Sequence, residues 1–178
     1  MSQRSIIAVC LDCGDTLIDE ATEIKDAADM SLSGQLIPGA GEMVRELKQR
    51  GYKLALVADG PAATFRNNLA PHGLYDLFDA YAISEEVGVK KPDARMFENA
   101  LDQLDIGREK YGKVVMVGNN LGRDVKGANA LGIISVWLDW SSRRSKVPAD
   151  DSEIPRYTIR TPMGLVPLLE ALDGAEHE

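Results

Sequence analysis

The sequence predicts an α/β protein with three layers, in which a mainly parallel sheet is covered by helices on both faces. Two observations predict this class. Several short uncharged runs are rich in β-branched residues, as in residues 5–11, which is typical of strands buried on both faces of a parallel sheet. Stretches with apolar residues at helical spacing alternate with these runs, and the connections are short. Such alternation builds right-handed βαβ units, whose helices cover the sheet.

The first third of the chain is expected to hold one strand and one helix. Residues 5–11 form the strand, which ends at Asp12. Residues 19–36 are polar and mildly helical, without a sustained apolar periodicity. Residues 40–50 form a helix because their apolar residues recur along one face, and Gly51 ends it as a C-terminal cap.

The middle of the chain continues the alternation. An apolar run at residues 53–58 predicts the second strand, and residues 62–70 predict a helix that the following Pro-His-Gly sequence breaks. A weaker strand is expected at residues 80–83. Pro92 opens the next helix, which carries apolar residues at helical spacing to about residue 104.

The last third of the chain adds two more buried strands. Residues 113–117 predict the fourth strand and residues 133–138 the fifth, and the helix between them ends at Gly132. That helix covers residues 125–131. The rest of the chain is expected to form a polar loop, a short strand and a final helix, at residues 139–156, 157–159 and 163–172.

The composition is that of one ordinary domain. The chain has 178 residues, 44% hydrophobic and 27% charged, with a formal net charge of −8. An acidic chain without a basic face does not attract nucleic acid by general charge. No apolar run is long enough for a membrane span, and residues 1–4 lead straight into the first strand, so we expect a cytoplasmic protein without a membrane partner. A single domain is expected over residues 1–178, with residues 19–37 as a short insertion and no substantial cap.

The two cysteines, Cys10 and Cys13, form a CxxC pair, which invites a redox or metal-binding interpretation. A structural zinc ion normally takes four ligands, and no second pair or nearby histidine completes this one. Two small buried thiols are therefore the better account of the pair.

Polar residues follow four of the expected strands at the point where each strand ends. In an open parallel sheet, the ligand crevice lies beyond these carboxyl ends. Carboxylates that face a lysine across such a crevice suit phosphoryl transfer, in which one carboxylate attacks an anionic centre while cations balance the charge. The residues are Asp12 and Asp15 after the first strand, Asp59 after the second, Lys90 and Lys91 after the third, and Asn119, Asn120 and Asp124 after the fourth.

Four motifs, in order along the chain, resemble those of the haloacid-dehalogenase-like (HAD) superfamily of phosphatases and related hydrolases. The first is a strand followed by D-C-G-D-T-L at residues 12–17, and the second is the end of a strand at residues 54–58. The third is Lys91 with the proline after it, and the fourth is G-N-N-L-G-R-D at residues 118–124. The resemblance covers nearly the whole chain and implies a Rossmann-like sheet with the strand order 5-4-1-2-3.

The resemblance also implies a mechanism and a set of site residues. Asp12 is the implied nucleophile, which forms an aspartyl intermediate, and Lys91 braces that carboxylate and the transferred group. The implied cofactor is Mg2+. The expected catalytic residues are Asp12, Asp15 and Lys91; the substrate-binding residues are Cys13, Ala58, Asp59, Gly60 and Lys91; and the metal ligands are Asp12, Gly14, Asn119 and Asp124.

Three positions depart from the family pattern. The resemblance places an acid two residues after the nucleophile, where it protonates the leaving oxygen, but this chain has Gly14 there and Asp15 one residue later. General acid–base help is worth roughly 10²–10⁴ in rate, so Gly14→Asp is expected to raise the rate unless Asp15 already fills the role. Ala58 replaces a hydroxyl residue that would bind a phosphoryl oxygen, and Asn119 replaces an acid at the metal site.

Several of these residues also have a plain structural interpretation. Asp15 is either a stand-in acid or the former of a turn. Asp59 precedes a helix and is expected to cap it. Arg143 and Arg144, beyond the fifth strand, are expected in a solvated loop, and the alternative is a wall that faces the substrate.

The expected function is Mg2+-dependent hydrolysis of a phosphate monoester, on a small molecule or on a larger phosphorylated substrate. The alternative is a catalytically weak or inactive module that binds phosphate or another protein, and metal-free dehalogenation is a third hypothesis. The chain between its motifs is too short for a cap domain, and family members without a cap have an open crevice. Such a crevice suits bulky substrates or closure by a second subunit, as in a homodimer.

Overall fold

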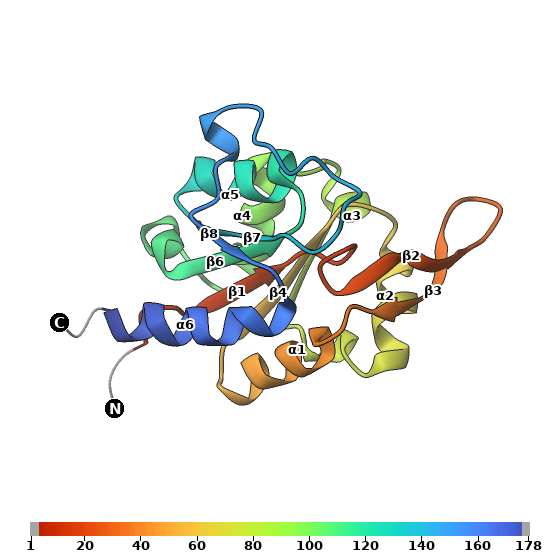
Figure 1. Ribbon diagram of the computed structural model, residues 1–178, viewed down its shortest axis with the longest axis horizontal. Helices are drawn as coiled ribbons and strands as arrows, with labels where there is room; N and C mark the ends of the chain where they lie inside the picture. Colours follow the sequence, from red (N-terminus) through yellow and green to blue (C-terminus); the bar gives the residue numbers. More distant parts are fainter. Residues whose placement is uncertain (1–3, 176–178) are drawn as a thin grey trace.

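A six-stranded parallel sheet lies at the centre of the computed structural model, between two layers of helices (Figure 1). The structure describes residues 4–175. The strands follow the order β5-β4-β1-β6-β7-β8, and every neighbouring pair is parallel. Their bounds are β1 Ala8–Leu11, β4 Lys53–Ala58, β5 Ala80–Ile83, β6 Val114–Gly118, β7 Ile134–Leu138 and β8 Tyr157–Ile159.

The predicted α/β class is confirmed, and the first five predicted strands lie in the order 5-4-1-2-3 when numbered along the chain. The sixth strand, β8, extends the sheet beyond β7, which the predicted order did not include. At the centre of the sheet, Leu11 at the end of β1 lies opposite Leu56 of β4 and Val117 of β6. The residues that follow these three strands therefore meet at one edge of the sheet.

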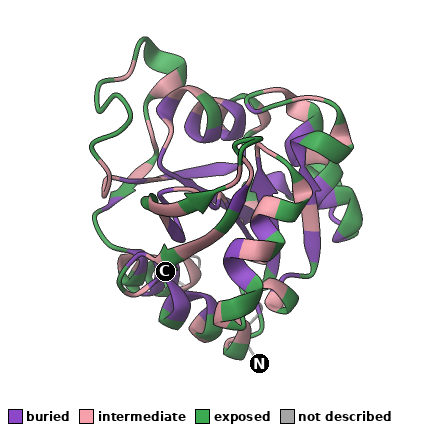
Figure 2. Cartoon of the chain, turned by 90° about the vertical axis from the view of Figure 1, so that its right-hand side faces the viewer, coloured by how far each residue is buried: buried purple, intermediate pink, exposed green. Residues whose placement is uncertain are grey.

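Helices cover both faces because successive strand residues point to opposite sides. Val9 of β1 packs in a core with Leu47 of α1, whereas the next residue, Cys10, packs in a core with Phe97 of α4. Figure 2 shows the central strands buried and the outer surfaces of the helices exposed. The helices are α1 Ala40–Gln49, α2 Ala62–Leu69, α3 Ser84–Val87, α4 Ala94–Gln103, α5 Lys126–Leu131 and α6 Leu165–Gly174.

Short helical turns join the main elements. None of the helices within residues 4–175 is long and apolar enough to cross a membrane. The short segments are η1 Ala70–His72, η2 Tyr75–Leu77, η3 Arg108–Lys113, η5 Asp151–Glu153 and η6 Pro162–Gly164, which are 3-10 turns, and η4 Leu121–Val125, which is a π turn.

A two-stranded antiparallel hairpin, β2 Ile18–Lys25 and β3 Ser31–Leu36, follows the first strand of the main sheet. The prediction that residues 19–36 are mildly helical is therefore wrong. The pairing register shifts inside the hairpin, and both of its faces carry polar side chains, so the sequence lacks the alternation that marks a strand. The hairpin lies against α2 (Figure 1). There, Asn68 accepts a hydrogen bond from the Ser31 hydroxyl at 2.9 Å.

Candidate active site

A pocket of about 400 Å³ opens at the carboxyl ends of the central strands. Asp12 enters it from the end of β1, Asp59 from the end of β4 and Asn119 from the end of β6. The crevice therefore lies where the topology of an open parallel sheet places it. Eight of the residues predicted for the site line this pocket: Asp12, Cys13, Gly14, Asp59, Gly60, Lys91, Asn119 and Asp124.

Lys91 is the cation at the base of the pocket, and its side chain is only 2% exposed. Its Nζ donates to Asp12 Oδ1 at 3.0 Å, to Asp124 Oδ1 at 2.6 Å and to the Val57 carbonyl oxygen at 2.7 Å. All three ammonium protons therefore have acceptors. Burial alone would lower the pKa of Lys91, but the surrounding carboxylates, Asp12 first among them, raise it above its ordinary value, so the amine stays charged.

Asp12 lies one residue beyond β1, and its backbone N–H continues the sheet by donating to the Val117 carbonyl oxygen at 3.0 Å. One carboxylate oxygen, Oδ1, accepts from Lys91. The side chain is 15% exposed, in contrast to the buried Lys91, so the carboxylate is held in place and still reached from the pocket. These are the requirements for an attacking carboxylate.

Asp124 shares the ammonium group of Lys91 with Asp12, and its side chain is 1% exposed. Its Oδ1 accepts from Lys91, and its Oδ2 accepts from the backbone N–H of Asn120 at 3.0 Å. Burial and the nearby Asp12 carboxylate raise the pKa of Asp124 above its ordinary value. A Cβ atom at Gly118 would lie 2.1 Å from Asp124 Oδ2, so the glycine of the fourth motif makes room for this carboxylate.

Asn119 lies beside Asp12 in the pocket lining. Its side-chain amide lies 3.1 Å from Asp12 Oδ2 and 3.3 Å from the carbonyl oxygen of Gly14. With its nitrogen turned toward these two oxygens, the amide donates to both; with its oxygen turned toward them, three oxygens converge on one point. Carboxylate, carbonyl and amide oxygens are the ligands of a hard cation such as Mg2+, so the donor set fits that ion. Residues 4–175 contain no group of three or more His, Cys, Asp and Glu that could hold a metal. Two of the oxygens at this point, from Gly14 and Asn119, are neutral.

Asp59 organises the loop that carries Lys91. Its Oδ1 accepts from the backbone N–H of Lys91 at 3.0 Å, and its Oδ2 lies 3.3 Å from Nη1 of Arg123. The expected helix-capping role is wrong, because α2 begins after Pro61 without a side-chain cap.

Two of the predicted phosphate-binding residues, Ala58 and Gly60, have other surroundings in the structure. The backbone N–H of Gly60 donates to the Ser84 hydroxyl at 2.8 Å, so it has a partner within the protein. Ala58 is fully buried inside the sheet and is not in the wall of the pocket. The backbone N–H of Gly60 is therefore already bonded within the protein, and Ala58 does not line the pocket, so phosphate binding at these two positions stays a prediction.

The comparison with known proteins agrees with this geometry. A family model described as haloacid dehalogenase-like hydrolase matches residues 31–132, more than half of the chain. The chain belongs to the haloacid dehalogenase-like hydrolase family. The resemblance seen in its motifs is confirmed.

Two curated relatives illustrate the similarity. The chain is 31% identical to the glyceraldehyde 3-phosphate phosphatase of Methanopyrus kandleri over 127 residues, which are 71% of this chain and 53% of that protein. It is 38% identical to the phosphoserine phosphatase of Thermus thermophilus over 124 residues, which are 70% of this chain and 47% of that protein. The chain thus spans about half the length of these relatives.

The fold is also found among solved structures. The crystal structure of a HAD phosphatase from Thermococcus onnurineus superposes on this chain with a TM-score of 0.77. The sequence identity is 22%, and the superposition covers 94% of this chain and 100% of the other. At that identity the likeness shows a shared haloacid dehalogenase-like fold.

Asp15, the predicted stand-in acid of this haloacid dehalogenase-like hydrolase, is turned away from the pocket. Its fully buried carboxylate accepts from Arg143 twice, from Nε at 2.7 Å and from Nη2 at 2.9 Å, and from the backbone N–H of Glu20 at 3.1 Å. Burial raises the pKa of Asp15, but the bonds from Arg143 and from the Glu20 backbone outweigh burial and leave it below its ordinary value. A carboxylate held ionised in this way is poorly suited to donate a proton, so the structure favours the structural interpretation of Asp15.

Arg143 and Arg144 were expected in a solvated loop, but both line the pocket. Arg143 reaches back to the start of the hairpin, where its Nη2 donates to Asp19 Oδ1 at 2.8 Å as well as to Asp15. A loop of eighteen polar-rich residues, 139–156, offers no periodic pattern, so nothing in the sequence indicated which of its side chains return to the site.

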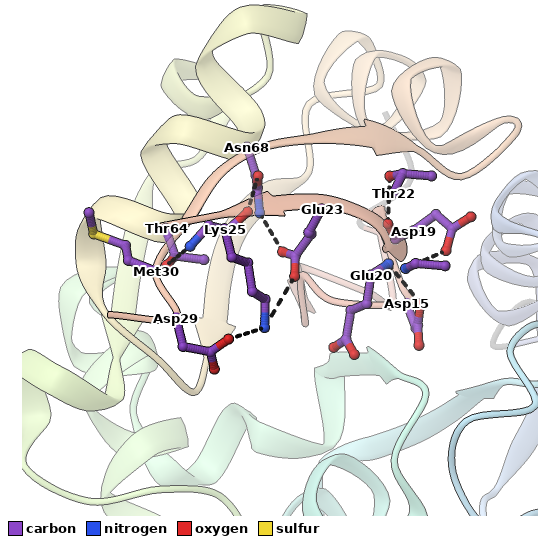
Figure 3. A network of polar contacts seen from close by, with 12 residues as sticks. Asp15, Asp19, Glu20, Thr22, Glu23, Lys25, Asp29, Met30, Thr64 and Asn68 are labelled. Atoms are coloured by element: carbon purple, nitrogen blue, oxygen red, sulfur yellow. Dashed lines mark hydrogen bonds and ion pairs between the residues drawn. The ribbon is translucent and has the colours of Figure 1, made fainter. Parts of the chain in front are cut away.

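The hairpin gives the pocket a charged wall that the sequence did not indicate. Figure 3 shows Glu20, Glu23, Lys25 and Asp29 extending from the hairpin to the same side. All four line the pocket. Burial first, and then the Asp15 carboxylate, raise the pKa of Glu20 above its ordinary value. Because the hairpin itself was not predicted, its inward-facing residues could not be assigned to the site.

Proposed function

We propose that this chain is a phosphatase that hydrolyses small phosphate monoesters through an aspartyl-phosphate intermediate on Asp12 and depends on Mg2+. The observation that carries the proposal is the position of Asp12: its carboxylate lies at the edge of the pocket, with one oxygen fixed by Lys91 and the other facing Asn119. The named activities of the two curated relatives, both on small phosphorylated metabolites, support this class of substrate.

The first step is attack by the Asp12 carboxylate on phosphorus. A bond forms between a carboxylate oxygen and phosphorus while the bond from phosphorus to the ester oxygen breaks, and the departing alcohol takes up a proton. Water then attacks the phosphorus of the aspartyl phosphate, which releases inorganic phosphate and restores Asp12. Lys91 holds the nucleophile in one orientation and offsets part of the negative charge that accumulates in both steps.

Mg2+ would be held by Asp12 and by Asn119 with its amide oxygen turned inward, beside the carbonyl oxygen of Gly14. When bound, it would reduce the repulsion between the Asp12 carboxylate and a dianionic phosphate ester. Asp124 already accepts two hydrogen bonds within the protein, so we propose that its main role is to position Lys91.

The pocket and its walls favour a small polar substrate. A volume of about 400 Å³ holds a compact ester. The wall carries both signs of charge, with Lys25 and Arg144 among the cations and Glu23 and Asp29 among the anions. Closure of the pocket by a second subunit stays a prediction.

A phosphate-release assay tests the proposal. The purified protein is mixed with glyceraldehyde 3-phosphate, O-phosphoserine and para-nitrophenyl phosphate, each with Mg2+ and with a chelator. We expect release with Mg2+, none with the chelator, and none from Asp12→Asn, which keeps the shape of the side chain. Release that Asp12→Asn leaves unchanged would contradict the proposal, and the absence of release from every ester would favour the non-catalytic alternative.

A further inference from the structure

Glu20 occupies the space that a side chain at residue 14 would need. A Cβ atom built on Gly14 would lie 2.2 Å from Glu20 Oε1 and 3.0 Å from its Cδ, which is far inside van der Waals contact. Residue 14 is the position where the family motif has an acid, two residues after the nucleophile. The carboxylate that is missing at residue 14 of the motif is thus replaced in space by the Glu20 carboxylate from the neighbouring hairpin.

The backbone of Glu20 is fixed by a chain of contacts, and its carboxylate has two longer ion pairs with Arg143 and Arg144. Its backbone N–H donates to Asp15, and Asp15 is fixed in turn by the two bonds from Arg143. Gly14 also forms a β-bridge with Ile18, which ties the start of the hairpin to the loop after β1. The Oε2 atom lies 3.7 Å from Nη2 of Arg144, and the side chain is 30% exposed. One oxygen of Glu20 therefore faces the arginines while the other faces Gly14.

The other carboxylates of the pocket wall have different partners. Glu23 accepts a hydrogen bond from Asn68 at 2.8 Å, and Asp29 lies 3.2 Å from Nζ of Lys25. Asp15, which does not line the pocket, is buried and bound by Arg143. Among the carboxylates that line the pocket, Glu20 is the one placed against the backbone of the nucleophile motif.

We propose that Glu20 is the catalytic acid and base of the phosphatase reaction, in place of the acid missing at residue 14. The inference rests on the proposed function. As the bond between phosphorus and the ester oxygen breaks, the proton of the Glu20 carboxyl group passes to that oxygen and the alcohol leaves. As water attacks the phosphorus of the aspartyl phosphate, one of its protons returns to Glu20, and inorganic phosphate and free Asp12 are formed. Protons and charges balance over the two steps.

This placement changes the expectation for Gly14→Asp. In the wild-type background, the new side chain collides with the Glu20 carboxylate and must displace it, so the substitution exchanges one acid for another. If Glu20 supplies the acid, Gly14→Asp in the wild-type background is expected to change the rate little, in place of the increase expected from the motif alone. In a Glu20→Ala background the same space is empty, and an aspartate at residue 14 has room to act.

The test is a swap of the carboxylate between the two positions. We expect Glu20→Gln, which keeps the shape but removes the acid, to lower kcat for the best alkyl ester of the panel roughly 10²–10⁴-fold. Glu20→Ala should lower kcat by a similar factor. The double variant Gly14→Asp with Glu20→Ala should have a kcat at least about tenfold above that of Glu20→Ala, because the new aspartate restores part of the general acid help. Glu23→Gln, on the same strand, is the matched control and should lose much less than Glu20→Gln.

The leaving group separates a catalytic role from a structural one. An alkoxide needs a proton as it leaves and a nitrophenolate does not, so Glu20→Gln should slow the alkyl ester far more than para-nitrophenyl phosphate. Thermal unfolding of each variant shows that it is folded. Suppose that the wild-type protein is active, but Glu20→Gln leaves kcat for the alkyl ester nearly unchanged or slows both esters equally. That result would overturn the proposed role of Glu20 and leave the proposed function standing. A wild-type protein that releases no more phosphate than Asp12→Asn would overturn the proposed function, and this inference with it.

Discussion

Nζ of Lys91 lies 2.6 Å from Oδ1 of Asp124, and the two side chains are 2% and 1% exposed. A buried ion pair costs desolvation energy when it forms, and removal of one partner leaves the other charge uncompensated. The same amine also holds Asp12, so this pair links the stability of the core to the orientation of the nucleophile.

Lys91→Met is expected to destabilise the protein by about 3–5 kcal/mol, because it leaves the Asp124 carboxylate buried without its partner. The double variant Lys91→Met with Asp124→Asn should lose clearly less free energy of unfolding than the sum of the losses of the two single variants, since neither member of the buried ion pair is then left charged without its partner. Urea unfolding of the four proteins measures the coupling. Additive losses would show that the two groups do not depend on one another.

Arg143→Ala is expected to lower the free energy of unfolding at pH 7 by about 1.5–3 kcal/mol, because the buried Asp15 carboxylate loses two charge-assisted hydrogen bonds. The pKa of Asp15 is lowered in the folded protein, so its ionised form adds stability above the ordinary pKa of about 3.9. That contribution is lost as the pH falls through the lowered value. The difference between wild type and variant should therefore shrink below about pH 4, as followed by urea unfolding at a series of pH values. A difference independent of pH would mean that Arg143 stabilises the protein through packing alone.

The thiols of Cys10 and Cys13 are expected to be inert in the folded protein. Burial raises the pKa of Cys10 to about 12, and burial together with the Asp12 carboxylate holds the pKa of Cys13 well above its usual range. The thiolate is the reactive form, so little is present at neutral pH. A colorimetric thiol reagent should label neither cysteine in native buffer and both in denaturant. Fast labelling of the native protein would revive the redox or metal interpretation of the CxxC pair.

The sequence predicted the site best where a polar residue comes directly after a buried strand. The uncharged run that ends at Asp12 predicted both a central strand and a carboxylate at the crevice, because a strand buried on both faces is typical of the inside of a parallel sheet. Lys91 and Asp124 follow two other strand regions, and the topology brings all three together. The family motifs added the roles of these residues.

The sequence was least informative where a site residue depends on an element with a weak pattern. The hairpin that carries Glu20 is polar on both faces and has an irregular register, so its sequence predicts a mildly helical segment and not two strands. Arg143 comes from a long polar loop in which no periodicity selects one side chain. Asp15 is predicted as a stand-in acid only from its closeness to Asp12 in the sequence. In the structure its φ is 51°, and its carboxylate contacts Arg143 instead of the pocket.

The central claim is that Asp12 carries the phosphoryl group during turnover, and trapping that group tests it most directly. The protein is mixed with Mg2+ and the best ester of the panel, quenched in acid within the first turnover, digested and examined by mass spectrometry. We predict the mass of one phosphoryl group on the peptide that contains Asp12, absent from Asp12→Asn and lost when the reaction runs to completion before the quench. Phosphate release at the full rate with no phosphoryl group on that peptide, or with the group on another residue, would contradict the account.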